Sequence, residues 1–327
     1  MSASRRHRWS SRSVGARWQH QFFYLLIRLG GRLGGRRLAY AFAWIVVGWY
    51  MLLRPDLRER CRPYLARRFP GEGASIGNCF RLSYGFAQAL IDRAMAGILG
   101  PDSLKAEFRG KEKLLPLMAA RQGFILMGAH AGCWQAAMAA IDFLDMPVNM
   151  LITREQGDVD RHWFEHRKGS GKAPFKVIDP SGYLGGTLDM IAALKKGEVV
   201  CVMGDRVFGG EGSALALPFL GEQALFPVSA YKLASATGAP VVVMLSHKTG
   251  FDACVLDVAK VIHVPAKLPR GREGVAPYAR QFVQALEAYV GEHPFQFYNF
   301  FDMWACGQER SDAAEPEARP YAQGEKA

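Results

Sequence analysis

The second half of the chain alternates short apolar runs with longer amphipathic segments. The runs of strand length are 123–128, 147–152, 198–203 and 240–245. Segments of helical length lie between them, at 132–144, 183–196 and 228–237. Continuous apolar runs are typical of strands buried on both faces, and strands that alternate with helices favour a parallel sheet. We therefore predict an α/β fold with a mostly parallel central sheet flanked by helices.

The flanking segments extend this pattern. Residues 252–264 predict a further strand or a hairpin, and residues 274–293 carry apolar positions at the spacing of an amphipathic helix. Residues 21–100 show helical spacing as well, interrupted by a predicted turn at "RRFPGEG" (67–73).

The chain divides into four predicted regions. They are a basic, disordered arm (1–20), an N-terminal helical region that associates with a membrane (21–104), the α/β domain (105–306) and a polar, disordered tail (307–327).

Positive charge is concentrated at the N-terminal end. Residues 1–68 contain fifteen arginines and two acids, Asp56 and Glu59, so this segment accounts for the whole net charge of +11. Such a segment favours an anionic partner, either nucleic acid or anionic lipid. We expect no nucleic acid, because no groove-reading motif accompanies the arginines.

The uncharged stretch "LAYAFAWIVVGWYMLL" (38–53) favours lipid instead. It carries five aromatic residues and is bracketed by arginines. Sixteen helical residues span about 24 Å, which is short of a ~30 Å hydrocarbon core. We expect an anchor that dips into an anionic membrane surface or barely crosses it, and a buried core helix is the alternative.

His130 lies where an apolar run gives way to a helix-like segment, in "FILMGAHAGCWQAAMAA" (124–140). Sites of parallel α/β sheets gather beyond the carboxyl ends of the strands. A helix N-terminus there directs N–H groups at developing negative charge, and a histidine beside it is equipped as a general base for acyl transfer. The alternative is a structural, hydrogen-bonding histidine. We expect the flanking Gly128 and Gly132 to bind substrate.

Four stretches resemble one family in the order in which they occur. "GAHAGCWQ" is similar to the His-x-x-x-x-Asp/Glu block of the lysophospholipid acyltransferase superfamily, and most closely to its bacterial lipid A late acyltransferase branch. The other three are "GDRVFGGEGSALALPFLGEQALFP" (204–227), "LASATGAPVVVM" (233–244) and "FYNFFDMWA" (297–305). The resemblance spans roughly residues 20–306 and implies a glycerol-3-phosphate acyltransferase-like fold.

The resemblance also implies an activity. His130 would take a proton from a hydroxyl or amine of a lipid or glycolipid acceptor, which attacks an acyl-thioester of acyl carrier protein or coenzyme A. No cofactor and no metal is implied, and the six scattered cysteines, without a C-x-x-C pair, also argue against a zinc site. Because acyl-thioesters are cytosolic, we expect the protein on the cytoplasmic face of the inner membrane, anchored by residues 38–53.

The chain departs from the family pattern at Gln135, where the resemblance implies an acid that orients the imidazole. A glutamine carbonyl can accept a hydrogen bond from the ring but cannot pair with an imidazolium charge. Three interpretations stay open. Gln135 orients His130 in a working enzyme, another acid such as Asp205 approaches His130 in space, or catalysis has been lost.

Other candidates for substrate binding follow predicted strands. Asp205 and Arg206 end the run at 198–203, and Arg154 follows the run at 147–152. An arginine there could bind a phosphate of the donor or acceptor. A surface salt bridge or a solvated loop is the alternative for each.

Two other functions compete with acyl transfer to a lipid. The first is a catalytically silent, lipid-binding relative, and the second is a thioesterase that transfers the acyl group to water. No Gly-x-Ser-x-Gly follows a strand-like run, which counts against an α/β-hydrolase type of thioesterase.

Overall fold

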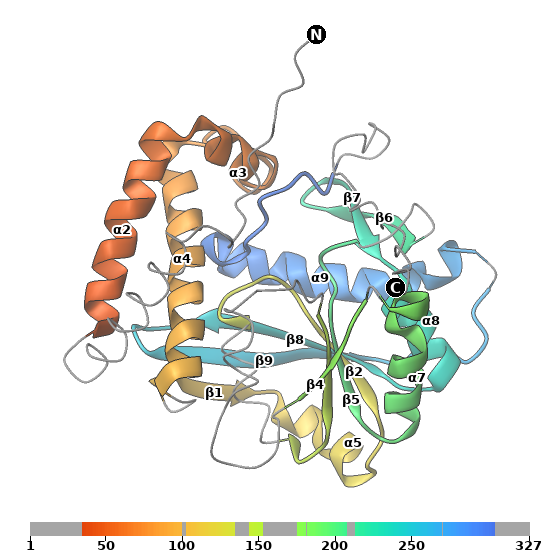
Figure 1. Cartoon of the computed structure of the whole chain (residues 1–327). Helices are drawn as coiled ribbons and strands as arrows, with labels where there is room; N and C mark the ends of the chain where they lie inside the picture. Colours follow the sequence, from red (N-terminus) through yellow and green to blue (C-terminus); the bar gives the residue numbers. More distant parts are fainter. Residues whose placement is uncertain are drawn as a thin grey trace, which may run out of the picture.

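The computed structural model describes residues 35–99, 103–134, 144–152, 175–180, 182–207, 213–269 and 271–304. Within these ranges, a sheet of seven strands forms the centre of the molecule (Figure 1), in the order β1-β9-β8-β2-β5-β3-β4. The strands are β1 (Lys105–Arg109), β2 (Phe124–Gly128), β3 (Val148–Leu151), β4 (Lys176–Ile178), β5 (Val199–Met203), β8 (Val241–Lys248) and β9 (Ala253–Ile262). All neighbouring pairs in this sheet are parallel except β8 and β9. The prediction of a mostly parallel α/β sheet is confirmed.

The central strands are buried on both faces. In β2, Ile125 and Met127 pack into one apolar cluster with α7 (Thr187–Lys195), α8 (Ser229–Thr237) and α9 (Ala276–Glu292). Phe124 and Leu126 point the other way, into a second cluster that includes α5 (Leu115–Ala119). Because side chains alternate along a strand, this double burial requires the unbroken apolar run seen in the sequence.

The structure confirms the predicted strands at 123–128, 147–152, 198–203 and 240–245, and it makes 252–264 a single strand, β9. Helix α9 confirms the amphipathic helix, and α7 and α8 confirm the helical segments before and after β5. Most of the predicted helix at 132–144 lies outside the described residues.

An antiparallel hairpin of β6 (Ala214–Phe219) and β7 (Glu222–Pro227) lies apart from the main sheet. Its two-residue turn places Leu220 and Gly221 at φ of 52° and 83°. Positive φ at both positions matches the twist of the two strands, and the Leu220 N–H donates to the Glu287 carboxylate at 2.7 Å. Hydrogen bonding and strand twist thus hold a leucine in a conformation that leucine rarely adopts.

Three helices form a layer beside the sheet: α2 (Gly35–Leu53), α3 (Pro55–Arg68) and α4 (Ile76–Leu99). In Figure 1, α4 stands between α2 and the sheet. The turn predicted at 67–73 separates α3 from α4. No single described helix is long and apolar enough to cross a membrane, although α2 and α3 meet that criterion as a pair bent by 95°.

Candidate active site

His130 and Asp205 occupy matching places on neighbouring strands. Strands β2 and β5 are parallel, with Gly128 opposite Met203. His130 and Asp205 each follow two residues later, at the carboxyl edge of the sheet. The register alone therefore brings two residues together that are 75 positions apart in the chain.

The two side chains form a close pair. His130 Nδ1 lies 3.0 Å from both carboxylate oxygens of Asp205, and the His130 main-chain N–H donates to Oδ2 at 3.2 Å. An ionised carboxylate only accepts hydrogen bonds, so Nδ1 carries the proton and Nε2 keeps its lone pair. The side chain of His130 is 18% exposed and that of Asp205 is 2% exposed. The carboxylate is thus sequestered, while the ring remains accessible.

The electrostatics keep this carboxylate ionised. Burial raises the pKa of Asp205, but the charge that His130 carries when protonated, the hydrogen bonds that His130 donates and the nearby Arg206 together hold this pKa below its usual value. A buried, ionised acid beside Nδ1 fixes the tautomer of the neutral histidine.

The C-terminal segment fixes the turn that carries His130. The His130 carbonyl accepts from the Tyr298 N–H at 2.8 Å, and the Gly132 N–H donates to the Gln296 carbonyl at 2.7 Å. Ala131 and Phe297 form a β-bridge between these two contacts. The backbone of the turn is therefore set by main-chain bonds from a segment more than 160 residues away in the chain.

Gly132 is required by this arrangement. Its φ is +56°, and a Cβ at this position would lie 1.8 Å from the Ser246 carbonyl oxygen. Its N–H is already bonded to Gln296, so the structure uses this donor to hold the turn. Gly128 ends β2, and its carbonyl accepts from the Gly204 N–H at 2.8 Å.

Replacing Gly132 by alanine is expected to lower about 100-fold the acyl-transfer activity that the resemblance implies, because displacement of a catalytic group by about 1 Å costs a factor of this size. Rates of thiol release by purified variants would measure the effect. Gly221→Ala is the matched control, since Gly221 also has positive φ but nothing within 4 Å of its Cβ position. Full activity of Gly132→Ala would contradict a rigid turn at His130.

An aromatic wall extends from the histidine to the helical layer. The Trp134 ring lies 5.5 Å from the His130 ring, 5.6 Å from that of Tyr298 and 6.3 Å from that of Phe86. Phe86 belongs to α4, and its ring also meets that of Phe300 at 5.3 Å. Its members come from three separate segments of the chain, so the sequence does not show how they assemble. The motif "FYNFFDMWA" was the only signal of it.

The structure describes only some of the remaining candidate residues. Gln135 and Arg154 lie outside the described residues. Arg206 follows Asp205, and its guanidinium lies 5.5 Å over the Phe301 ring, with a buried Nε that has no hydrogen-bond partner among the described residues. The buried carboxylate of Asp205 contacts His130, as the second of the three interpretations expects, and its role in substrate binding stays a prediction.

The sequence contains a Gly-x-Ser-x-Gly motif at 73–77, and the structure shows that it does not follow a strand. It lies in the turn before α4, where Ser75 Oγ accepts from the Asn78 N–H at 3.3 Å. Ser75 therefore caps a helix there and does not follow a strand as the nucleophile of an α/β hydrolase does.

The described residues contain no group of three or more His, Cys, Asp or Glu side chains that could hold a metal ion.

Comparison with known protein families identifies the class of enzyme to which the chain belongs. Residues 47–305 match the model of the bacterial lipid A biosynthesis acyltransferases. This match covers most of the chain, and the protein belongs to that family. It is an acyltransferase that uses an acyl donor and a lipid acceptor. No curated protein gives a significant match to the chain.

Proposed function

We propose that the protein transfers a fatty acyl group from an acyl-thioester, carried by acyl carrier protein or coenzyme A, to a hydroxyl or amine of a lipid or glycolipid. His130 is the general base. The observation that carries this proposal is the His130–Asp205 pair, which engages Nδ1 and leaves Nε2 without a hydrogen-bond partner among the described residues, at the carboxyl edge of the sheet.

The proposed reaction needs no covalent enzyme intermediate. His130 Nε2 takes the proton of the acceptor O–H or N–H as the acceptor atom bonds to the thioester carbonyl carbon. The carbon–sulfur bond of the tetrahedral intermediate then breaks, and the imidazolium returns the proton to the leaving thiolate. Asp205 stabilises the imidazolium between these two steps.

This assignment gives Asp205 the role that the family pattern places at Gln135. A glutamine cannot balance the imidazolium charge, whereas a buried carboxylate 3.0 Å from Nδ1 can. The pair therefore supports a working site over the silent, lipid-binding alternative.

Arg206 is proposed to bind an anionic group of the donor or acceptor. Within the part of the chain that the structure describes, its buried Nε lacks a hydrogen-bond partner, and its guanidinium stacks on Phe301 beside the His130–Asp205 pair. A phosphate or carboxylate would satisfy the unpaired donor. Arg154 remains a second candidate for such a contact.

The proposed setting is the cytoplasmic face of the inner membrane. Acyl-thioesters are cytosolic and the acceptor is a lipid, so the site must reach both. The apolar stretch 38–53 and the arginines around it support attachment to an anionic surface.

Thiol release tests the proposal. The full chain in mild detergent would be offered acyl-carrier-protein and acyl-coenzyme A donors, with bacterial lipid extract as acceptor. We expect acceptor-dependent release that falls at least 100-fold in His130→Ala, the low end of a general base's contribution. His263→Ala is the matched control, because His263 is exposed and follows β9 at the opposite edge of the sheet.

Other outcomes would overturn it. Release that needs no acceptor would indicate a thioesterase. No release from any donor by a folded protein would indicate the silent relative.

A further inference from the structure

Helix α2 presents one apolar stripe to the outside of the molecule. The stripe consists of five residues spaced alternately by four and three positions: Leu38, Phe42, Ile45, Trp49 and Leu52. Each is between 61% and 67% exposed. Trp44 and Leu53 widen the stripe, so it runs along the full length of the helix.

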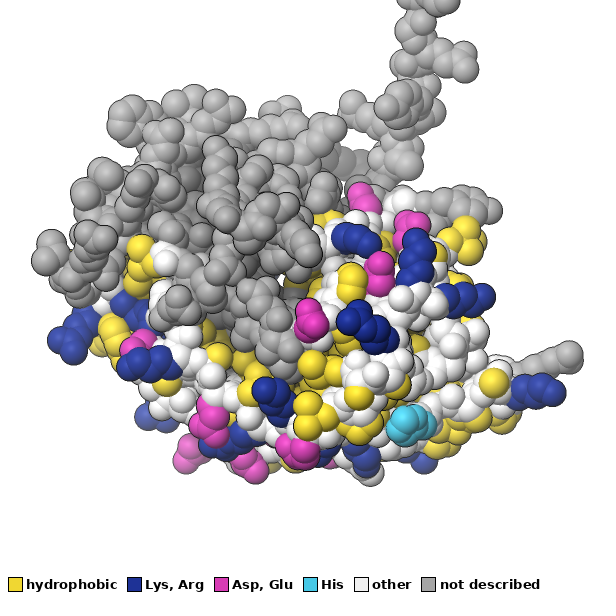
Figure 2. Space-filling view, turned by 90° about the horizontal axis from the view of Figure 1, so that it is seen from below, with side chains coloured by type: hydrophobic (Ala, Val, Ile, Leu, Met, Phe, Trp, Pro, Cys, Tyr) yellow, Lys and Arg dark blue, Asp and Glu magenta, His cyan; other side chains and the backbone are white. Residues whose placement is uncertain are grey.

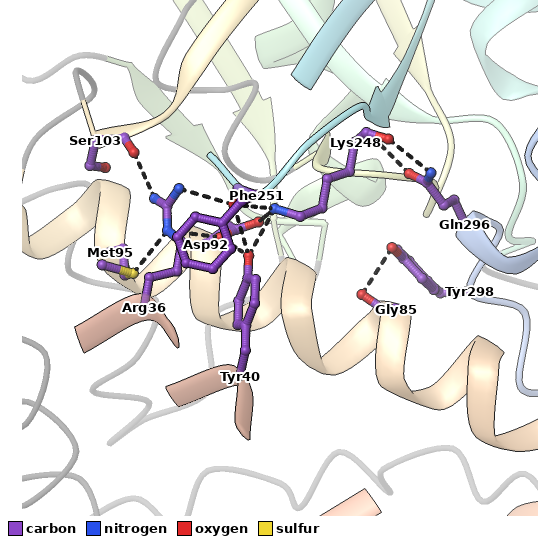
Figure 3. A network of polar contacts seen from close by, with 10 residues as sticks. All are labelled: Arg36, Tyr40, Gly85, Asp92, Met95, Ser103, Lys248, Phe251, Gln296 and Tyr298. Carbon is purple, nitrogen blue, oxygen red and sulfur yellow. Dashed lines mark hydrogen bonds and ion pairs between the residues drawn. The ribbon is translucent and has the colours of Figure 1, made fainter. Parts of the chain in front are cut away.

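The opposite side of α2 is fastened to the α/β domain near its first turn (Figure 3). The Arg36 guanidinium donates to the Ser103 carbonyl at 2.6 Å and lies 3.5 Å from Asp92 of α4. Tyr40 donates to Asp92 and accepts from Lys248 Nζ at 2.8 Å. Lys248 ends β8 and itself binds Asp92 at 2.6 Å. The N-terminal end of α2 is therefore tied to the central sheet.

The other end of α2 leads into α3, which is fastened to the same domain. Arg68 donates to the Val290 and Gly291 carbonyls of α9 at 2.8 and 2.7 Å, and Arg67 pairs with Glu222 of β7 at 2.7 Å. Tyr64 donates to the Pro294 carbonyl at 2.6 Å. The two ends of α2 are thus held to the same α/β domain, the first directly and the second through α3.

We propose that α2 lies flat in the interface of an anionic bilayer and does not cross it. This inference rests on the proposed function, which places the acceptor in the membrane. Nineteen helical residues extend about 28 Å, slightly less than a ~30 Å hydrocarbon core. A crossing helix would carry its two ends to opposite sides of the bilayer. One of the two fastenings to the α/β domain would then have to break.

The charged and aromatic residues around the stripe indicate that lipid covers it. Arg37 and Arg54 are exposed at the two ends of the stripe, and α3 adds Arg60 and Arg62. Arginines and tryptophans around an apolar face are typical of helices that lie in the headgroup region. On the face seen in Figure 2, by contrast, side chains of both charges are interspersed.

A second copy of the chain fits the stripe less well. The alternate spacing would suit a coiled-coil seam, but such seams are flanked by charged residues that select the partner. Residues 38–53 contain no charged residue. The flanks of the stripe are apolar as well, as lipid contact requires.

A flat α2 also explains how a lipid reaches the site. Helix α4 packs against α2 and presents Phe86 to the aromatic wall beside His130. Helix α4 therefore lies between α2 and the aromatic wall beside His130.

Depth measurements test this orientation. Leu38→Cys, Ile45→Cys and Leu52→Cys, each in a Cys306→Ser background, would carry a nitroxide label, with the unsubstituted background labelled as blank. Power saturation would give label depth in vesicles of phosphatidylcholine with phosphatidylglycerol. We expect similar depths at all three positions. A crossing helix would separate the first and last by about 21 Å, at ~1.5 Å per residue, and would overturn the proposal.

Vesicle partitioning supplies an independent measure. We expect Leu52→Glu to weaken partitioning into these vesicles about tenfold or more, since it removes a leucine from apolar contact. Leu188→Glu is the matched control, because Leu188 is 54% exposed on α7. Equal effects of the two variants, or label–label coupling that reveals a dimer through the stripe, would overturn the proposal. Thiol release with acceptor dispersed in detergent separates this failure from failure of the catalytic proposal.

Discussion

Asp205→Asn is expected to lower acyl-transfer turnover by about three to four orders of magnitude. The asparagine keeps the volume of the side chain but removes the charge that stabilises the imidazolium. Its amide can also present an N–H to Nδ1 and so favour the wrong tautomer. The corresponding change in a serine protease triad lowers turnover about 10⁴-fold. Initial rates of thiol release at saturating donor would measure the loss.

The control for this prediction is Gln135→Ala. If Asp205 orients His130, as its 3.0 Å contacts indicate, loss of the Gln135 amide will lower turnover less than loss of the Asp205 charge. The reverse order of effects would show that Gln135 orients the base.

Because the pKa of Asp205 lies below its usual value of about 3.9, the carboxylate stays ionised throughout neutral pH. Its stabilising contribution is lost only as the pH falls through this lowered pKa.

Asp92→Ala is expected to destabilise the protein by about 3–5 kcal/mol. Asp92 is fully buried and is the shared counterion of Arg36 and Lys248, whose side chains are 5% and 16% exposed. Removing one member of a buried ion network leaves the other charges without compensation, and this costs more than the network contributes. Denaturant unfolding in detergent, followed by circular dichroism, would give the change in free energy.

Asp252→Ala provides the comparison. Asp252 pairs with Lys105 at 3.1 Å, but both side chains are exposed, and ion pairs in such a setting contribute little to stability. A loss below 1 kcal/mol for Asp92→Ala would mean that the network does not hold α2 on the domain.

The loss of stability caused by Tyr40→Phe is expected to lie between the losses caused by Asp92→Ala and Asp252→Ala. Burial and the adjacent Asp92 raise the pKa of Tyr40 well above its usual value, so its hydroxyl remains a hydrogen-bond donor.

The sequence was sufficient for strands whose whole length is apolar. β2, β5 and β8 each lie under helices on both faces, so their runs are continuous and visible. β1 and β4 lie at the two edges of the sheet and carry exposed, charged residues in "KAEFR" and "KVI". Their strand conformation comes from pairing with a neighbour, and this leaves little trace in the composition.

The His130–Asp205 pair shows the same limit. His130 was predicted from its place after a strand, but the family resemblance placed its partner at position 135, which is Gln135 here. Asp205 could be offered only as one of three interpretations, because its approach depends on β2 and β5 being neighbours in register. Once that pairing is known, the pair can be identified directly, because His130 lies two residues after Gly128 and Asp205 lies two residues after Met203. Strand order was the missing information.

The bonds between the His130 turn and residues 296–298 also impose an order of events during synthesis. Domains fold as units while the chain emerges from the ribosome, beginning with its N-terminal part. Here helices α2, α3 and α4 emerge long before the segment that sets the backbone at His130. Under the proposed function, the nascent chain can therefore meet the bilayer before its site is complete. The His130 turn reaches its final geometry only when residues 296–298 have left the ribosome and bonded to it.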